Sequence, residues 1–334
     1  MTRLSSIRAE VGRRSLSERV VVLAGGLSAE RDISIRSGRR VAEALRDTGL
    51  DVDVLDVDAH LLIALTEDRP ACVIPLLHGA HGEDGAISDV LEALDLPYVG
   101  SAPGGARLAY DKTIAKTLLG QSGVSVPAGV CLPHATFRDL GASAVLRAVT
   151  ARLALPVVVK PAHGGSALGV SIVHSLEDLP TAMVTAFAYG DSVLIEQWIG
   201  GVEVAVSVVD IGGDRAPLAL PAIEIRPDSG VYDYTARYTA GVTEFIAPAD
   251  LDEASTMAAA KVALAAHELL GLRDWSRTDL IVTSESGLPT AWFLEANVAP
   301  GTTETSLLPQ AISAAGLELG AVVRQLVEGA IARH

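Results

Sequence analysis

Two apolar segments near the C-terminus flank a turn that contains Gly287, and this pattern predicts a β-hairpin. A hairpin folded about Gly287 pairs Asp279 with Glu295. The same register pairs Arg277 with Asn297. Because side chains two residues apart on a strand share a face, we expect these four polar side chains to meet on one surface of an otherwise apolar hairpin.

Two carboxylates and an amide oxygen on a rigid scaffold are the ligand types that a hard cation such as Mg²⁺ prefers. The alternative is a solvent-exposed cluster of ion pairs, which would contribute little to stability. The choice between a metal site and an ion-pair cluster depends on whether the rest of the chain carries nucleotide-binding features.

A chain of 334 residues is too long for one ordinary hydrophobic core, so two or three domains are expected. The hydrophobic content of 49% and the charged content of 20% describe a compact globular protein, and no apolar run reaches the length of a membrane span. The net charge of −15 argues against a nucleic-acid partner, because no basic face that could follow phosphates is present.

The N-terminal segment lacks the apolar core and the cleavage site of an export signal. The two cysteines, Cys72 and Cys131, lie in apolar stretches, and we expect both to be small core residues of a reduced protein. A cytoplasmic location is therefore predicted.

Strands and helices alternate over residues 20–110, which predicts an open parallel α/β domain behind an N-terminal extension of residues 1–19. Residues 111–199 predict a smaller α+β unit. Residues 200–334 predict longer strands, the hairpin and two further helices. The chain is therefore expected to combine α/β and α+β parts in three domains.

The 26 basic residues include only four lysines: Lys112, Lys116, Lys160 and Lys261. Lys116 and Lys261 lie in helix-like stretches and are expected on the solvated surface. Lys160 instead ends a buried strand directly before a Gly-rich loop at 164–169. Glycines let backbone N–H groups approach phosphate oxygens, and a nearby lysine adds a point charge. The alternative is a simple hairpin turn, but together with the hairpin carboxylates the loop predicts a phosphate-binding site.

Three further segments carry candidate polar groups. Glu196 lies in an apolar strand where an adenine amino group can be held, and Glu203 follows closely enough to take a ribose hydroxyl; the alternative is a strand whose glutamate faces solvent. Glu30 follows the first strand, where open α/β sheets bind ligands, and can receive an ammonium group. His78 and His81 suggest zinc, but this spacing presents both rings together only on a helix, which the neighbouring glycines disfavour. A substrate-facing loop is expected instead.

In this order, the motifs resemble those of the ATP-grasp ligases, and specifically the D-alanine–D-alanine ligase family, from about residue 20 to the C-terminus. The resemblance is carried by Gly25-Gly-Leu-Ser-Ala-Glu-Arg31, Leu77-His-Gly79 with Glu83-Asp-Gly85, Asp111-Lys112, Lys160-Pro161 with its loop, Tyr232-Asp-Tyr234 through Tyr238, and Glu295-Ala-Asn297-x-x-Pro300-Gly301 followed by Ser306-Leu307. It implies a three-domain ATP-grasp fold with an N-terminal open parallel α/β domain.

For the nucleotide, the resemblance implies that Lys112 and Lys160 contact the phosphates of ATP. Glu196, Gln197 and Ile199 would line the adenine pocket, and Glu203 would contact the ribose. The resemblance also implies two Mg²⁺ ions, with Mn²⁺ as an alternative, held by Asp279, Glu295 and Asn297.

For the two substrates, the resemblance implies that Glu30 binds the ammonium of the first D-alanine, with His78 nearby. Arg277 and the backbone N–H of Gly301 would stabilise the oxyanion, and Arg237 and Ser306, with Leu307 beside them, would hold the carboxylate of the second D-alanine. Tyr238, Ser166 and Glu30 would form a hydrogen-bonded triad that closes the loop.

The activity implied by the resemblance is the ATP-dependent ligation of two D-alanines through an acyl phosphate, for peptidoglycan synthesis, by a cytoplasmic homodimer. One alternative is a paralogue of specialised metabolism that joins a different amino-acid pair. The other is a non-catalytic, nucleotide-binding regulatory protein.

Four departures from the family pattern bear on the substrate pair. Gln197 and Arg237 stand where most relatives have lysine, Ala167 replaces a serine, and Thr302 replaces Met or Phe. Relatives that form an ester lack the tyrosine of the triad, so Tyr238 favours a peptide product.

Overall fold

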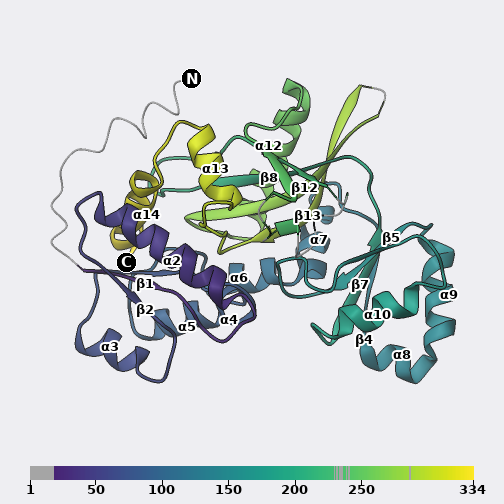
Figure 1. Cartoon of the computed structure of the whole chain (residues 1–334), viewed down its shortest axis with the longest axis horizontal. Coiled ribbons are helices and arrows are strands. Elements are labelled where there is room, and N and C mark those ends of the chain that lie inside the picture. Colours follow the sequence, from purple (N-terminus) through teal and green to yellow (C-terminus); the bar gives the residue numbers. More distant parts are fainter. Residues whose placement is uncertain are drawn as a thin grey trace.

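The computed structural model describes residues 19–334 except 229, 231, 233–235, 238, 240 and 286; the side chains of His81 and Glu285 are also outside the description. Residues 1–18 of the predicted extension are therefore not described. The described residues form three β-sheets with helices packed around them (Figure 1).

The first part of the chain contains β1 (Val20–Leu23), α2 (Arg31–Arg46), β2 (Val52–Leu55), α3 (Leu61–Glu67), β3 (Cys72–Pro75), α4 (Ala80–Glu83), α5 (Ala86–Ala93) and α6 (Pro103–Tyr110). Its three strands are parallel, in the order β2-β1-β3. Alternate residues of the fully buried β1 pack into two different hydrophobic clusters. This pattern is typical of a parallel strand with helices on both faces.

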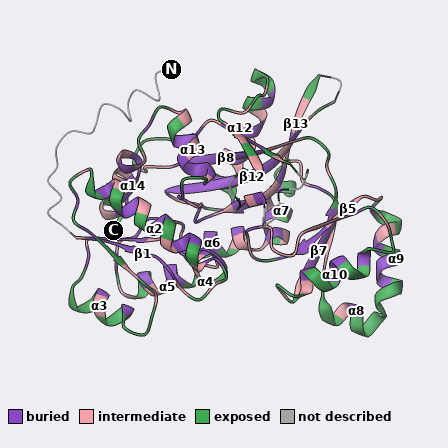
Figure 2. Cartoon of the chain, in the orientation of Figure 1, coloured by how far each residue is buried: buried purple, intermediate pink, exposed green. Residues whose placement is uncertain are grey.

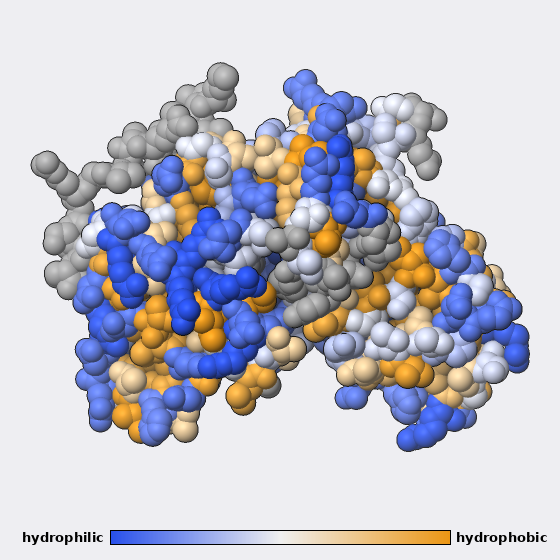
Figure 3. All heavy atoms as spheres, in the orientation of Figure 1, coloured by the Kyte–Doolittle hydropathy of each residue, from blue (hydrophilic) through white to orange (hydrophobic). Residues whose placement is uncertain are grey.

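Helix α2 is amphipathic, and it positions Ser37 on its buried face and Glu30 at its N-terminus. Its buried positions include Ser37, Val41 and Leu45, which are spaced by four residues. Glu30 precedes its first turn. The exposed side chains of the opposite face include Arg36, Arg39 and Arg46. This side of the molecule carries much hydrophilic, blue surface in Figure 3.

The second part contains α7 (Lys112–Gln121), β4 (Gly129–Pro133), α8 (His134–Leu140), α9 (Ala142–Arg152), β5 (Val157–Pro161), β6 (Ser171–Val173), α10 (Leu179–Phe187) and β7 (Ser192–Gln197). Its strands form an antiparallel sheet in the order β4-β7-β5-β6. Val157 and Val159 pack against α9 and α10, whereas Val158 and Lys160 line a cavity on the opposite face. One strand therefore serves both a core and a binding surface.

The third part contains β8 (Val202–Val209), β9 (Leu218–Ala219), β10 (Ile223–Pro227), β11 (Thr243–Ile246), α12 (Glu253–Leu269), β12 (Trp275–Glu285), β13 (Leu288–Asn297), α13 (Leu307–Ala314) and α14 (Leu319–Arg333). The sheet is antiparallel in the order β11-β10-β8-β12-β13, with β9 paired to β8. Val204, Val206 and Val208 pack toward α12, and Ala205 and Val209 toward α13 and α14. Helices therefore cover both faces, and β8 and β12 are largely buried in Figure 2.

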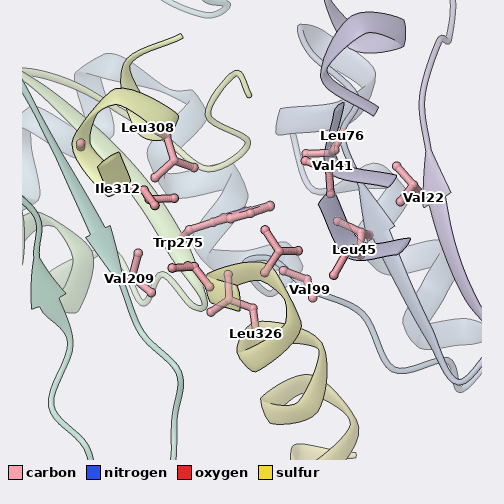
Figure 4. Packing of buried hydrophobic residues seen from close by; sticks show 14 of the residues in the cluster. Val22, Val41, Leu45, Leu76, Val99, Val209, Trp275, Leu308, Ile312 and Leu326 are labelled. Atoms are coloured by element: carbon pink, nitrogen blue, oxygen red, sulfur yellow. The ribbon is translucent and has the colours of Figure 1, made fainter. Parts of the chain in front are cut away.

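One hydrophobic core joins the first and third parts. Trp275 is 1% exposed and lies at its centre in Figure 4. Val209 and Leu308 of the third part lie on one side of the indole, and Val41 and Leu45 of α2 lie on the other. Removing a buried tryptophan side chain typically costs about 3–5 kcal/mol, so this contact holds the two parts together as one framework.

Strands β12 and β13 form the predicted hairpin. Asp279 pairs with Glu295 and Arg277 pairs with Asn297. The register predicted from the sequence for the polar end of the hairpin is therefore confirmed.

The route to that register differs from the expectation. Near the turn, Glu285 pairs with Leu288. A hairpin centred on Gly287 would instead pair Glu285 with Pro289, so the observed register differs by one residue there. A β-bulge then shifts the register beside Leu280, which pairs with Phe293. Leu294 is thus the extra residue, and it restores the expected pairing at the polar end.

The segment after His78 departs from the expectation of a loop without helix, because α4 makes one helical turn there. Its Gly82 allows this, since a Cβ at that position would lie 2.0 Å from the backbone oxygen of Leu77. His78 precedes the helix, and the side chain of His81 is outside the description. The prediction that glycines prevent a helix here was wrong.

Other expectations are met in part. The combination of a parallel α/β part with antiparallel α+β parts is confirmed. Cys72 is buried as expected, whereas Cys131 is only partly buried. The domain bounds 20–110, 111–199 and 200–334 stay a prediction. No helix in the described part of the chain is long and apolar enough to cross a membrane.

Candidate active site

A cavity of about 260 Å³ lies between the four-stranded and the six-stranded sheets. We call it the large cavity. A second cavity of about 60 Å³, the small pocket, is lined by residues of α2, of the loop after β3 and of the segment after β13. Tyr232 and Arg237 line both compartments, so the two adjoin.

The structure groups the predicted site residues into these two compartments. The large cavity is lined by Lys112, Lys160, Glu196, Gln197, Ile199, Glu203, Asp279 and Glu295. The small pocket is lined by Glu30, His78, Ser166, Arg277, Asn297, Gly301, Ser306 and Leu307. Tyr238 lies outside the described residues, as do Asp233 and Tyr234 of the same motif.

Cations surround both carboxylates of the hairpin. Arg277 donates two hydrogen bonds to Asp279, from Nε at 2.7 Å and from Nη2 at 3.1 Å. Lys112 Nζ lies 3.3 Å from Glu295 Oε2, and Arg237 Nη2 lies 3.8 Å and 3.9 Å from the two carboxylates. Burial alone would raise the pKa of Glu295, but Lys112 and the other surrounding cations outweigh burial and lower it to about 2. Glu295 is therefore ionised.

The donor set suits magnesium but is incomplete by itself. Among the described residues there is no group of three or more His, Cys, Asp or Glu side chains that could hold a metal ion. Asp279 and Glu295 supply two carboxylates, and Asn297 supplies an amide oxygen that already accepts the N–H of Ala299 at 2.9 Å. Mg²⁺ commonly completes its shell with water and substrate phosphates. These residues fit a magnesium ion that a nucleotide brings with it.

Helix α7 and the Gly-rich loop bring a lysine and a serine to the junction of the two compartments. Asp111 caps the helix by accepting the N–H of Thr113 at 2.9 Å, which fixes the start of the helix at Lys112. Lys112 Nζ donates to the backbone oxygen of Gly164. Ser166 Oγ donates to the carboxylate of Glu30. The loop is thus held closed against the first part of the chain.

Lys116 was expected on the surface, and this prediction was wrong. It is 6% exposed, and its Nζ lies 2.9 Å from Glu196 Oε2. Lys160 Nζ lies 2.6 Å from Glu196 Oε1. The sequence did carry a signal, because residues four apart on a helix share a face and Lys116 follows Lys112 at that spacing. Lys261 is exposed as expected.

The carboxylates of the small pocket are buried and have few charge partners. Burial raises the pKa of Glu30, against the lowering effect of the hydrogen bond from Ser166. Burial and the neighbouring Glu30 raise the pKa of Glu83 to about 8. Burial lowers the pKa of His78 to about 4, so this ring is neutral, and its Nε2 lies 3.2 Å from Ser37 Oγ. Glu83 belongs to the Glu83-Asp-Gly85 motif, to which the sequence assigns no role.

The loop before α13 forms the wall opposite Glu30. Ser306 Oγ accepts the N–H of Thr303 at 3.0 Å. A Cβ at Gly301 would lie 2.8 Å from Ser306 Oγ, so the close approach requires glycine. Thr302 is fully buried, and its Oγ1 donates to the backbone oxygen of Ser37 at 3.2 Å. This loop is therefore tied to helix α2.

The fold and the two adjoining compartments are typical of an ATP-grasp ligase. A family model described as "D-ala D-ala ligase C-terminus" matches residues 118–328. A D-alanine–D-alanine ligase from Desulforudis audaxviator is 40% identical over 312 residues, which are 92% of this chain and 97% of that protein. The chain therefore belongs to the D-alanine–D-alanine ligase family, and the predicted ATP-grasp fold is confirmed.

Two solved structures are similar over nearly the whole chain. The D-alanine–D-alanine ligase of Bacillus anthracis complexed with ATP has a TM-score of 0.77 and 26% identity, covering 95% of this chain and 98% of that one. The VanG D-Ala:D-Ser ligase of Enterococcus faecalis has a TM-score of 0.79 and 26% identity, covering 94% of this chain and 99% of that one.

Proposed function

We propose that this protein joins two D-alanines to D-alanyl-D-alanine, with cleavage of ATP to ADP and phosphate, for peptidoglycan synthesis. One observation carries the proposal. The polar end of the hairpin presents Asp279 and Glu295 to the large cavity, and Arg277 and Asn297 to the small pocket beside it. Groups suited to phosphate transfer and to amide formation therefore lie on adjacent positions of one rigid element.

In this proposal the large cavity holds ATP. Lys112 and Lys160 contact the phosphates, and Glu196 accepts the adenine amino group. Glu203 takes a ribose hydroxyl. It is partly buried, and this desolvation raises its pKa to about 7, which suits a hydroxyl partner because a hydroxyl does not need a full negative charge. Support for ATP comes from the similar Bacillus anthracis ligase, which is complexed with ATP.

We also propose that Asp279, Glu295 and Asn297 hold Mg²⁺ when ATP is bound. The metal would offset negative charge on the transferring phosphoryl group. Lys112, which lies 3.3 Å from Glu295, is then free to turn toward phosphate oxygens, and Arg237, which lies 3.9 Å from Glu295, is free to turn toward the second substrate.

The first step activates a carboxylate, which by itself is a poor electrophile. The ammonium of the first D-alanine binds Glu30. A carboxylate oxygen of this D-alanine attacks the γ-phosphorus of ATP. The bond to the ADP oxygen breaks, and an acyl phosphate forms. The hydrogen bond from Ser166 to Glu30 keeps the loop closed and limits hydrolysis by water.

The second step forms the peptide bond. The amine of the second D-alanine, whose carboxylate lies against Arg237 and Ser306, attacks the acyl carbon. Arg277 and the N–H of Gly301 donate to the oxyanion, a contribution of typically about 3–4 kcal/mol for one such donor. The carbon–oxygen bond to phosphate then breaks, and the amine releases a proton.

The test uses the pure protein with ATP, Mg²⁺ and D-alanine as the sole amino acid. Equal amounts of phosphate and D-alanyl-D-alanine are expected. D-Serine and D-lactate are then added as competing second substrates, and we expect the D-alanine dipeptide to remain the main product. Turnover with another amino acid, but none with D-alanine, would favour the paralogue and overturn the proposal. Nucleotide binding without turnover on any amino acid would favour the regulatory alternative.

Membership of the family also leads us to propose a cytoplasmic homodimer. Size-exclusion chromatography with light scattering is expected to give twice the mass of the 34.6 kDa chain. A monomer that is fully active across the tested concentrations would contradict the dimer without affecting the proposed reaction.

A further inference from the structure

A buried group of three charged side chains lies behind the proposed adenine site. Glu196 is 2% exposed, and it lies between Lys116 and Lys160, which are 6% and 7% exposed. The two ammonium groups approach different oxygens of the carboxylate, at 2.9 Å and 2.6 Å. Burying an unpaired charge costs much free energy, so each of these side chains requires its partners in order to stay charged.

The two lysines differ in what else they reach. Lys160 and Glu196 line the large cavity, and Lys116 does not. Lys116 Nζ instead donates to the backbone oxygen of Phe293 at 3.2 Å and lies 6.0 Å from the centroid of its ring. Lys116 is therefore fixed to β13 behind the cavity, whereas Lys160 can contact a ligand.

The charge states agree with two ion pairs. Burial lowers the pKa of Lys116 to about 8, although Glu196 opposes this effect. Burial would raise the pKa of Glu196, but the two lysines outweigh it and lower the pKa. Burial would likewise lower the pKa of Lys160, but Glu196 and Glu295 raise it. The carboxylate therefore remains ionised while both lysines are present.

The carboxylate also has accepting capacity left. Glu196 Oε2 lies 2.9 Å from the ammonium of Lys116, and Oε1 lies 2.6 Å from the ammonium of Lys160. A carboxylate offers about four acceptor positions. Glu196 lines the large cavity, so an acceptor position that Lys160 releases is suited to an N–H group of a ligand.

We propose that Lys116 is a positioning residue for adenine recognition. It holds Glu196 in place and charged, so that Lys160 can leave this carboxylate for the phosphates of ATP while Glu196 accepts the adenine amino group. The inference rests on the proposed function, because it takes ATP to be the occupant of the large cavity. Lys116 itself touches neither the nucleotide nor the reacting atoms.

A purely structural role for Lys116 makes a different prediction. A lysine that only neutralises a buried glutamate affects stability, but it has no influence on which base the site prefers. Inosine triphosphate separates the two roles, since it carries an oxygen in place of the amino group of adenine and has no donor at that position.

The experiment measures dissociation constants of ATP and inosine triphosphate in Mg²⁺ for the wild type and for Lys116→Met. Sites built to bind a substrate N–H reject analogues without it, so we expect the wild type to prefer ATP by about tenfold or more. Lys116→Met is expected to bind ATP roughly tenfold more weakly, with a preference reduced to about twofold. The KM for D-alanine at saturating ATP is expected to stay unchanged. Lys261→Met, which alters an exposed lysine of α12, is the matched control.

A second variant protects the test from a folding defect. In Lys116→Met/Glu196→Gln the unpaired charge is removed as well, so we expect this protein to fold and to bind the two nucleotides as Glu196→Gln does. A folded Lys116→Met, or a folded double variant, that keeps the wild-type preference for ATP would overturn the role of Lys116. A wild type that binds neither nucleotide would instead contradict the proposed function.

Discussion

Two carboxylates of the large cavity and two of the small pocket are balanced in different ways. In the large cavity, Glu196 and Glu295 have close lysine partners and pKa values below the ordinary range. In the small pocket, Glu30 and Glu83 have raised pKa values because they are buried, and Glu83 lies 3.9 Å from the neutral His78. In the proposed function, the cations of the large cavity contact phosphate, whereas the carboxyl groups of the small pocket receive a cationic substrate group.

The largest effect is expected from a substitution of Arg277, which lies at the boundary between the two compartments. Arg277 serves both, since it pairs with Asp279 and also lines the small pocket. Arg277→Met is expected to lower kcat about 10²–10³-fold, because the oxyanion loses a charged donor. ATP binding is expected to change far less. Steady-state kinetics and ATP binding are compared with Arg39→Met, which alters an exposed residue of α2. A kcat within a few fold of the wild type would exclude the oxyanion role.

The next effect tests the paired side alone. Glu295→Gln removes the charge of a proposed metal ligand and the partner of Lys112, so we expect kcat to fall about 10²-fold and the Mg²⁺ concentration for half-maximal activity to rise roughly tenfold. Magnesium titrations of activity measure both quantities. Unchanged activity at low Mg²⁺ would show that Glu295 is no metal ligand.

A smaller effect tests the unpaired side through stability. The pKa of Glu83 is about 8 in the folded protein and 4.5 as the ordinary value. Between these values the folded protein holds a proton that the unfolded chain has released, so the free energy of unfolding falls as pH rises. We expect a loss of roughly 2 kcal/mol between pH 6 and pH 8 from this group.

Glu83→Gln is expected to remove that part of the pH dependence. Thermal unfolding of wild type and variant at pH 6 and pH 8 provides the measurement. Glu295 acts in the opposite sense, since its lowered pKa gives stability that is present above pH 4.5 and lost toward pH 2. Parallel pH profiles of wild type and Glu83→Gln between pH 6 and pH 8 would contradict the proposed difference between the compartments.

The smallest effect concerns the link between the small pocket and helix α2. Thr302→Val keeps the shape but removes the hydrogen bond to the backbone oxygen of Ser37, which is expected to cost about 1 kcal/mol of unfolding free energy. Ser37 also contacts His78, so the KM for D-alanine is expected to rise about two- to fivefold. Chemical denaturation and initial rates give the two values. A variant equal to the wild type in both would mean that the link has no role in substrate binding.

Local pattern was enough to predict the parts of the fold that repeat regularly. Alternation along the hairpin predicted which four polar residues meet, and a lysine before a Gly-rich loop indicated a lining residue of the large cavity. The family resemblance predicted which further residues line the two compartments, but their roles stay predictions.

What the sequence did not predict depends on tertiary contacts. A lysine in a helix is exposed unless another element packs over it, and Lys116 is buried because β13 and Glu196 lie there. Glu83 looks like a loop residue until α4 turns it into the small pocket. Neither outcome follows from propensity, since both require knowing which distant segments are neighbours.

The bulge at Leu294 has a consequence for the shape of the large cavity. In a regular strand, neighbouring side chains point to opposite faces, yet Leu294 and Glu295 both line this cavity. Strand β13 thus places an apolar side chain, Leu294, directly beside a carboxylate, Glu295, on the surface of the cavity. Deleting this one leucine would allow a regular ladder that still pairs Asp279 with the glutamate, but it would remove part of the apolar surface of the cavity proposed for the nucleotide.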